Sequence, residues 1–136
     1  MLFSETDNPE LYIAALTVWR EARGECYQGK QGVAQVIYNR MTDLERRWPR
    51  TATEVCKEPF QFSCWNSNDP NSDKYPDGGD TSWDDSCDAI SDVFVKRIAD
   101  LTDRANCYYE RHIPPPDWAT PDKRTVEIGN HIFFRL

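Results

Sequence analysis

The sequence contains no long apolar run, no long basic run and no CxxC pair. No window approaches the roughly 18 apolar residues that a transmembrane helix needs, so we expect no membrane insertion. The net charge is −7, and this acidic excess disfavours binding to nucleic acid or anionic lipid. The chain begins without the basic and apolar segments of a secretory signal. We therefore expect synthesis in the cytoplasm and a need for outside help to leave it.

Cysteine and histidine are few and lack the spacing of a metal site. The cysteine count is odd, so at least one thiol is unpaired within a monomer: Cys26, Cys56, Cys64, Cys87 and Cys107. We expect mainly reduced thiols, as in a cytosolic product. A zinc site from Cys87, Cys107, His112 and His131 would lack ligand-pair spacing and is disfavoured. A Cys–His nucleophilic pair is a further, weaker hypothesis.

What is present favours one folded domain. The 136 residues are 39% hydrophobic and include five Trp, six Tyr and six Phe, enough for a single core. No proline occurs between Pro9 and Pro49, which favours two uninterrupted helices. The first should start at Asn8–Glu10, with an Asx cap, and stop at Gly24. The second should run from about Gly29 to Leu44, with Gly32 allowing close approach to the first.

The rest of the chain predicts shorter elements. Residues 51–54 form a capping box for a third helix, and the polar segment 67–81 predicts a long exposed loop. Another helix should start at residues 82–85 and carry an apolar stripe as far as Leu101. Gly129-Asn130 predicts a small hairpin. The predicted class is α+β, mostly α, as one domain over residues 1–136 with a small β element near the C-terminus.

Glu21 is the strongest candidate for chemistry. It lies late in the first apolar helix, just before Gly24, with Trp19 and Ala22 beside it. Burial there would raise the pKa of its carboxyl group and keep it protonated near neutral pH, as a general acid requires. The alternative is a solvated helix residue paired with Arg23 or Lys30. Composition and spacing leave these two interpretations open.

Several motifs resemble those of one family. In chain order they are residues 21–25 (Glu-Ala-Arg-Gly-Glu), 32–40 (Gly-Val-Ala-Gln-Val-Ile-Tyr-Asn-Arg), 60–66 (Phe-Gln-Phe-Ser-Cys-Trp-Asn), Trp118-Ala119 and 128–133 (Ile-Gly-Asn-His-Ile-Phe). Over about residues 11–134 the chain resembles the cell wall hydrolase family that includes spore cortex-lytic enzymes. The resemblance implies a lysozyme-like fold, related to soluble lytic transglycosylases, and cleavage of peptidoglycan glycan strands. Because no signal peptide or wall-binding repeat is seen, the chain looks most like a phage endolysin or phage particle enzyme.

The resemblance also implies roles for individual residues. Glu21 corresponds to the catalytic glutamate, and Glu25 then looks structural. The mixture of aromatic and hydrogen-bonding groups suits sugar rings and their hydroxyls, so we expect a substrate cleft lined by Gln61, Phe62, Ser63, Trp65, Tyr108, Tyr109 and Trp118. The two phenylalanines, Phe60 and Phe62, are expected to be mainly structural. Arg23, Asn39 and Arg40 are expected to support the site, with Arg40 fixing a carboxylate or a helix end.

The number of carboxyl groups bears on the reaction type. A hydrolytic glycosidase needs two, about 5–9.5 Å apart, whereas a lytic transglycosylase uses one as acid and then as base. Only Glu21 is convincing, which favours a lytic transglycosylase that forms 1,6-anhydromuramyl ends. The alternatives are a hydrolytic muramidase, with its second carboxylate in the 69–85 segment, and a non-catalytic wall-binding module. We expect action on the wall after release by a holin or another route, and a monomer.

The acidic loop offers one further pattern. Its residues fit positions 1, 3, 5, 9 and 12 of a calcium loop: Asp69, Asn71, Asp73, Asp77 and Asp80. Lys74 replaces the glycine expected at position 6, and the last ligand is Asp rather than Glu. A solvated loop is therefore the favoured interpretation, and we expect neither a metal nor any other cofactor.

Overall fold

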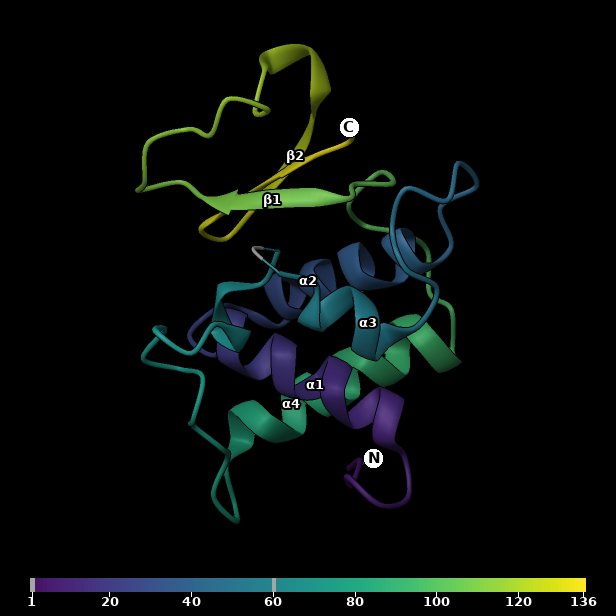
Figure 1. Ribbon diagram of the computed structural model, residues 1–136, viewed down its shortest axis with the longest axis vertical. Coiled ribbons are helices and arrows are strands. Elements are labelled where there is room, and N and C mark those ends of the chain that lie inside the picture. Colours follow the sequence, from purple (N-terminus) through teal and green to yellow (C-terminus); the bar gives the residue numbers. More distant parts are fainter. Residues whose placement is uncertain (1, 60) are drawn as a thin grey trace.

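The computed structural model describes residues 2–59 and 61–136, with a group of helices on one side and a small sheet on the other (Figure 1). The helices are α1 (Pro9–Ala22), α2 (Tyr27–Met41), α3 (Ala52–Lys57) and α4 (Thr81–Ile90), which continues into a π-helical turn at Ser91–Val95. The strands are β1 (Cys107–Glu110), β2 (Arg124–Ile128) and β3 (His131–Phe134). The predicted α+β, mostly α class is confirmed. Phe60 lies outside the described residues.

Helix α1 forms the centre of the core. It starts at Pro9 with Glu10 in its first turn, as predicted, and buries a run of side chains that includes Ala14, Leu16 and Val18. The predicted Asx cap is wrong, because the Asn8 side chain makes no capping hydrogen bond. Asn8 has φ −135° and ψ 61°, outside the extended conformation that directs a cap oxygen toward the first turn.

Helix α2 lies between α1 and the sheet, and it both starts and ends earlier than predicted. It ends at Met41, where the Thr42 hydroxyl donates to the Tyr38 carbonyl over 2.9 Å. Gly32 does allow a close approach, but not the predicted one to the first helix. A Cβ at this position would lie 2.6 Å from Cζ of Phe133, so the glycine accommodates β3.

The two later helices differ in how well the sequence predicted them. The Thr51 cap of α3 is confirmed, since Thr51 Oγ1 accepts a hydrogen bond from the Glu54 amide over 3.2 Å. The Glu54 carboxylate accepts from the Thr51 hydroxyl over 3.1 Å, in place of the Thr51 amide of a full capping box. Helix α4 is capped by Asp80, whose Oδ1 accepts from the Trp83 amide over 3.0 Å. Its predicted extension to Leu101 is wrong. The helical segment ends at Val95, Arg97 has φ 52°, and Ile98 is 37% exposed.

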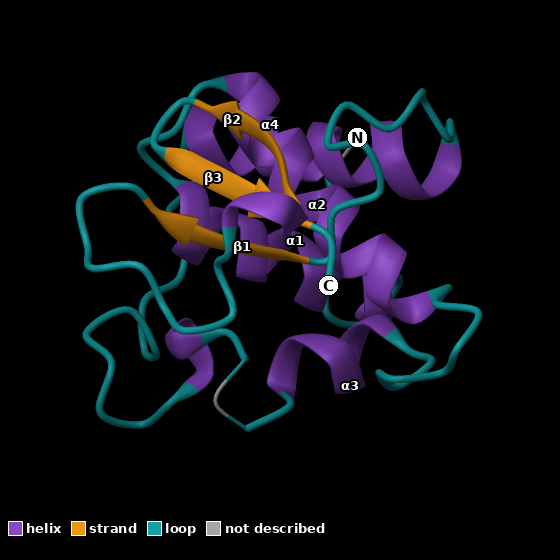
Figure 2. Ribbon diagram, turned by 90° about the horizontal axis from the view of Figure 1, so that it is seen from above, coloured by secondary structure: helices purple, strands orange, loops and turns teal. Residues whose placement is uncertain are grey.

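The sheet is antiparallel with the order β1-β3-β2, and it covers the helices when viewed from above (Figure 2). The hairpin between β2 and β3 is confirmed, with Gly129 at φ 59° in the turn. Strand β1 was not predicted. All four residues of β3 are buried. Phe133 packs against Val36 of α2, whereas Phe134 packs on the opposite face near Trp118.

Two expectations about the whole chain can be compared with the structure. All five cysteines are free thiols, as expected for mainly reduced side chains. Within residues 2–59 and 61–136, no helix is both long enough and apolar enough to cross a membrane.

Candidate active site

The Glu21 carboxyl group is held by groups from two other parts of the chain. Glu21 is the penultimate residue of α1. The hydroxyl of Tyr108, on β1, donates to its Oε1 over 2.9 Å. The backbone N–H and the thiol of Cys64, in the turn Ser63–Trp65, lie close enough to favour the charged form of this carboxyl group. The surroundings of Glu21 are therefore built by helix, turn and sheet together.

The surroundings of Glu21 raise its pKa. Burial is the largest cause, because it penalises the charged form, and the nearby charge of Asp69 acts in the same direction. The Tyr108 hydroxyl, and the N–H and thiol of Cys64, oppose this shift without cancelling it. Glu21 thus holds its proton to a higher pH than an ordinary glutamate, as a general acid does. Neither Arg23 nor Lys30 pairs with it: Lys30 donates to the carbonyls of Arg23 and Glu25.

A cavity of about 410 Å³ opens beside this carboxyl group. It combines an acid, hydrogen-bonding groups and aromatic rings, and is lined by Glu21, Arg40, Gln61, Phe62, Ser63, Tyr108, Tyr109, Glu110, Ile113 and His131. Most of the predicted site residues therefore meet at one cavity. Phe62 is only 2% exposed, so its ring mainly fills the core and contributes little surface to the cavity.

Arg40 is a buried part of the cavity wall and contacts Gln61. Its Nε donates to the Asn106 carbonyl over 2.7 Å and its Nη2 to Sγ of Cys107 over 3.7 Å. Its Nη1 donates to Oε1 of Gln61 over 3.3 Å. The expected carboxylate or helix-end partner is wrong, because Arg40 instead contacts a loop carbonyl, a thiol and an amide. With its oxygen held, Gln61 turns its NH₂ group away from Arg40.

Two of the predicted sugar-binding aromatics lie outside this cavity. Trp65 donates from Nε1 to Thr17 Oγ1 over 2.8 Å, and the Arg20 guanidinium lies 4.6 Å from its ring centre. Trp118 packs edge-on against Tyr109 and Phe134, with ring centres 6.2 and 5.4 Å apart. Trp118 thus supports the cavity wall through Tyr109, and direct contact of either tryptophan with substrate stays a prediction.

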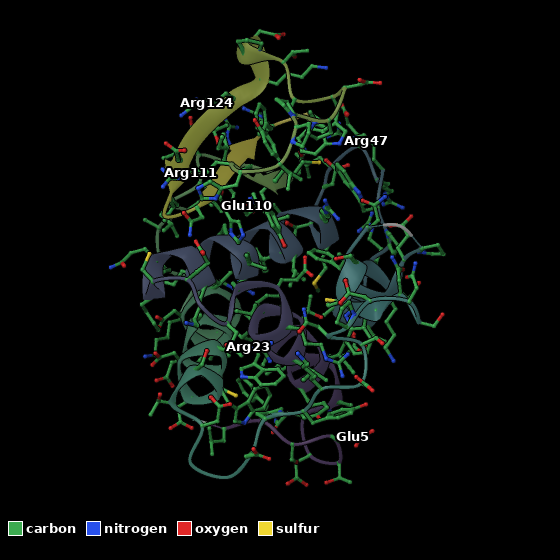
Figure 3. All side chains as sticks on the ribbon, turned by 90° about the vertical axis from the view of Figure 1, so that its left-hand side faces the viewer. Glu5, Arg23, Arg47, Glu110, Arg111 and Arg124 are labelled. Atoms are coloured by element: carbon green, nitrogen blue, oxygen red, sulfur yellow. The ribbon has the colours of Figure 1, made fainter. Side chains whose placement is uncertain are left out.

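The residues predicted to support the site connect its surrounding elements. Glu25 accepts hydrogen bonds from the amide N–H and side chain of Asn130, over 2.9 and 3.1 Å, which fixes the β2–β3 hairpin. Burial alone would raise the pKa of Glu25, but these bonds lower it. Arg23 donates to Asn71 Oδ1 over 2.9 Å, and Asn39 donates to the Ala105 carbonyl over 2.8 Å. Arg23 lies in the helical part, away from the sheet (Figure 3).

Three cavity residues were not predicted as site residues: Glu110, Ile113 and His131. Glu110 ends β1 and lies near Arg111 at the sheet (Figure 3). Strand alternation would place it on the same face as Tyr108, but β1 itself was not predicted. In the sequence, His131 was considered for a zinc site, which was disfavoured, and it lies within the family motif 128–133. Glu110 and His131 belong to different strands, and the sequence does not show that these strands face Glu21.

The acidic loop has its own structural contacts. Asp80 caps α4 with Oδ1 and accepts from Trp19 Nε1 through Oδ2 over 3.2 Å. Asp69 accepts from the Asn71 amide over 2.8 Å. Across the described part of the chain, no group of three or more His, Cys, Asp or Glu side chains is arranged to hold a metal ion.

The fold and site define a class of protein: a lysozyme-like domain with a half-buried glutamic acid beside a cavity of about 410 Å³. The family profile described as Cell Wall Hydrolase matches residues 24–134, and the chain therefore belongs to the cell wall hydrolase family. Glu21 lies just before the matched segment. A comparison with functionally curated proteins finds no match.

Two solved structures are similar over nearly the whole chain. The catalytic domain of the Bacillus cereus SleB protein has 30% sequence identity and a TM-score of 0.68, covering 93% of this chain and 89% of its own. The catalytic domain of the germination-specific lytic transglycosylase SleB from Bacillus anthracis has 26% identity and a TM-score of 0.75, covering 98% and 100%. The lysozyme-like fold expected from the sequence is confirmed.

Proposed function

We propose that this protein cleaves peptidoglycan glycan strands as a lytic transglycosylase, with Glu21 as acid and then base. The observation that carries the proposal is the half-buried Glu21 carboxyl group, whose pKa is raised, at the cavity. The similarity to a lytic transglycosylase catalytic domain supports the reaction type.

The reaction balances with one carboxyl group. Protonated Glu21 gives its proton to the glycosidic oxygen as the bond from that oxygen to the muramyl C1 breaks. The resulting Glu21 carboxylate takes the proton of the muramyl 6-hydroxyl, whose oxygen bonds to C1. Glu21 is protonated again, and the product carries a 1,6-anhydro end without consumption of water. The 6-hydroxyl belongs to the same sugar, which gives its attack a large advantage over water.

A second candidate function is hydrolysis, and Glu110 is the observation that favours it. Glu110 is the other carboxyl group among the described residues that line the cavity, and a hydrolytic mechanism needs two. Both Glu110 oxygens, however, accept hydrogen bonds from His112, from its backbone N–H over 3.1 Å and from its ring. This pairing disfavours Glu110 as the group that activates water, so transglycosylation is the primary proposal.

The biological setting is a separate part of the proposal. We propose action on the wall during phage lysis or wall penetration, after release by a holin or similar route. Complementation of a phage lacking its endolysin tests that setting directly. Restored lysis supports it, whereas purified enzyme that cleaves walls but never restores lysis contradicts it.

Loss of turbidity of purified peptidoglycan sacculi tests the activity. Glu21→Gln should bind sacculi yet lose about 10²–10⁴-fold in rate, because the amide cannot deliver a proton. Glu5→Gln, remote and exposed, is the matched control, and Glu25→Gln should lose much less than Glu21→Gln. Wild-type protein that binds sacculi but leaves them intact would indicate a non-catalytic wall-binding module instead.

A further inference from the structure

His131 is a buried histidine with one unpaired ring nitrogen. Its side chain is 4% exposed, and its Nδ1 is fully buried without a hydrogen-bond partner among the described residues. The ring nevertheless lines the cavity that contains Glu21. Buried polar groups are nearly always paired, so an unpaired nitrogen at a cavity needs an explanation.

The ring is held in place by Tyr108, the residue that contacts Glu21. The centres of the His131 and Tyr108 rings are 4.7 Å apart, and Phe133 packs edge-on against His131 at 6.3 Å. Because Nδ1 is enclosed, Nε2 is the nitrogen that can reach a molecule in the cavity. A neutral imidazole has one N–H and one lone pair. Buried N–H groups without an acceptor are rarer than unpaired acceptors, which favours the proton on Nε2.

We propose that His131 contacts the substrate, donating a hydrogen bond from Nε2–H to a hydroxyl or carbonyl oxygen of the glycan bound against Glu21. This inference rests on the proposed function, because the ligand it requires is the sugar chain that occupies the cavity. His131 would then fix the sugar relative to the acid, while Tyr108 fixes the acid itself.

The charges around the ring favour its neutral form. Burial lowers the pKa of His131, although the carboxylates of Glu25 and Glu110 oppose this shift. Glu21, whose pKa is raised mainly by burial, and the guanidinium group of Arg40 also line the cavity. When His131 gains a proton at low pH, the new cation beside Glu21 favours the Glu21 carboxylate, so at a given pH a smaller fraction of Glu21 carries the proton that the reaction needs. Relative to a variant without this histidine, activity should therefore fall as the pH falls through the lowered pKa of His131.

Two substitutions distinguish the role of the His131 N–H donor from the packing role of its ring. His131→Gln places an amide NH₂ near Nε2 but does not titrate, whereas His131→Phe keeps a ring and has no donor. We expect His131→Phe to lose about 10- to 100-fold in kcat/KM on sacculi, and His131→Gln to stay within about threefold of wild type. His131→Gln should also lose the His131-dependent fall in rate at low pH. His112→Gln, which alters the one other histidine, is the control.

NMR of the two imidazoles gives a readout apart from activity. His112→Gln assigns the signals, ¹⁵N shifts report the tautomer, and melting curves confirm that each variant is folded. The proposal expects a neutral Nε2–H ring at pH 7 whose signals shift when a sacculus digest is added. It is overturned by a proton on Nδ1, by a charged ring at pH 7, or by folded Gln and Phe variants of equal activity.

Binding distinguishes this proposal from the proposed function. In a Glu21→Gln background, sedimentation with sacculi should be weaker with His131→Phe than with His131→Gln. If wild-type protein fails to cleave sacculi but this difference holds, the catalytic proposal fails and the His131 contact stands. If wild-type protein cleaves sacculi but the two His131 variants bind them equally, the catalytic proposal stands and the His131 contact fails.

Discussion

The hydroxyl of Tyr108 reaches across 87 residues of sequence to donate a 2.9 Å hydrogen bond to Oε1 of Glu21. Glu21 lies near the end of the central helix of the core, and Tyr108 belongs to a strand of the small sheet. This hydrogen bond therefore forms only when the sheet is docked on the helices. Gly32 and Phe133, which meet closely at that junction, contribute to the site although neither lines the cavity.

Removing this hydrogen bond should change the pH dependence of the reaction. The Tyr108 bond lowers the pKa of Glu21, so Tyr108→Phe should raise it further. We expect a lower maximal rate, because the carboxyl group is less well held, and an alkaline limb displaced to higher pH. Initial rates on sacculi between pH 4 and 9 measure both effects. An alkaline limb displaced to lower pH would show that Tyr108 favours the protonated acid.

The raised pKa of Glu21 also predicts how stability changes with pH. Between about 4.5 and the folded pKa, the folded state holds a proton that the unfolded state has released. The stability that the folded state gains from protonated Glu21 is fully present below pH 4.5 and is lost as the pH rises through that window. The melting temperature of Glu21→Gln, minus that of wild type, should therefore grow from pH 4.5 upward and then level off. A difference that shrinks over this range would contradict the assigned shift.

The sequence predicts individual helices and turns of this protein better than it predicts the long-range contacts between them. Pro9, the Thr51 cap and Gly129 each specify structure through their own backbone or their next few neighbours, and each prediction was confirmed. Strand β1 was missed because its pairing with β3 is a long-range contact. The predicted helix to Leu101 failed because the apolar period continues past a π-helical turn and past Arg97, whose positive φ no period reveals.

In the candidate site, too, local features could be predicted from the sequence and long-range contacts could not. Glu21 could be proposed from its place in the first helix and from the family resemblance, and burial raises its pKa as expected. Glu110 and His131 could not be found in this way, because the sequence does not show which face of β1 and β3 meets Glu21. Trp65 fits a sugar-binding pattern in sequence, yet its indole N–H is already used by Thr17.

The close approach at Gly32 can be tested through stability. A methyl group there would lie 2.6 Å from Cζ of Phe133, a fully buried ring. We expect Gly32→Ala to cost about 1–3 kcal/mol in overpacking, offset by about 1 kcal/mol of helix propensity, with a net loss in urea unfolding. Gly24→Ala is the matched control, because a methyl group at Gly24 would meet no described part of the chain within 4 Å. An unchanged urea midpoint for Gly32→Ala would mean that β3 can move away from α2 at no cost in stability.

Activity should be independent of metal ions. In the acidic loop, Asp80 already caps α4 and contacts Trp19, while Asn71 Oδ1 accepts from Arg23. Dialysis against EDTA should leave both turnover and melting temperature nearly unchanged. A fall in both that calcium restores would show that the loop binds calcium.

Mass spectrometry of the reaction products, before and after borohydride reduction, decides between transglycosylation and hydrolysis. If Glu21 acts alone as acid and base, the new muramyl ends are 1,6-anhydro ends, lighter by one water than hydrolytic ends and resistant to reduction. Glu110→Gln should give the same product, since Glu110 takes no part in that chemistry. Reducible muramic acid ends that depend on Glu110 would instead show a two-carboxylate hydrolase and contradict the proposed mechanism.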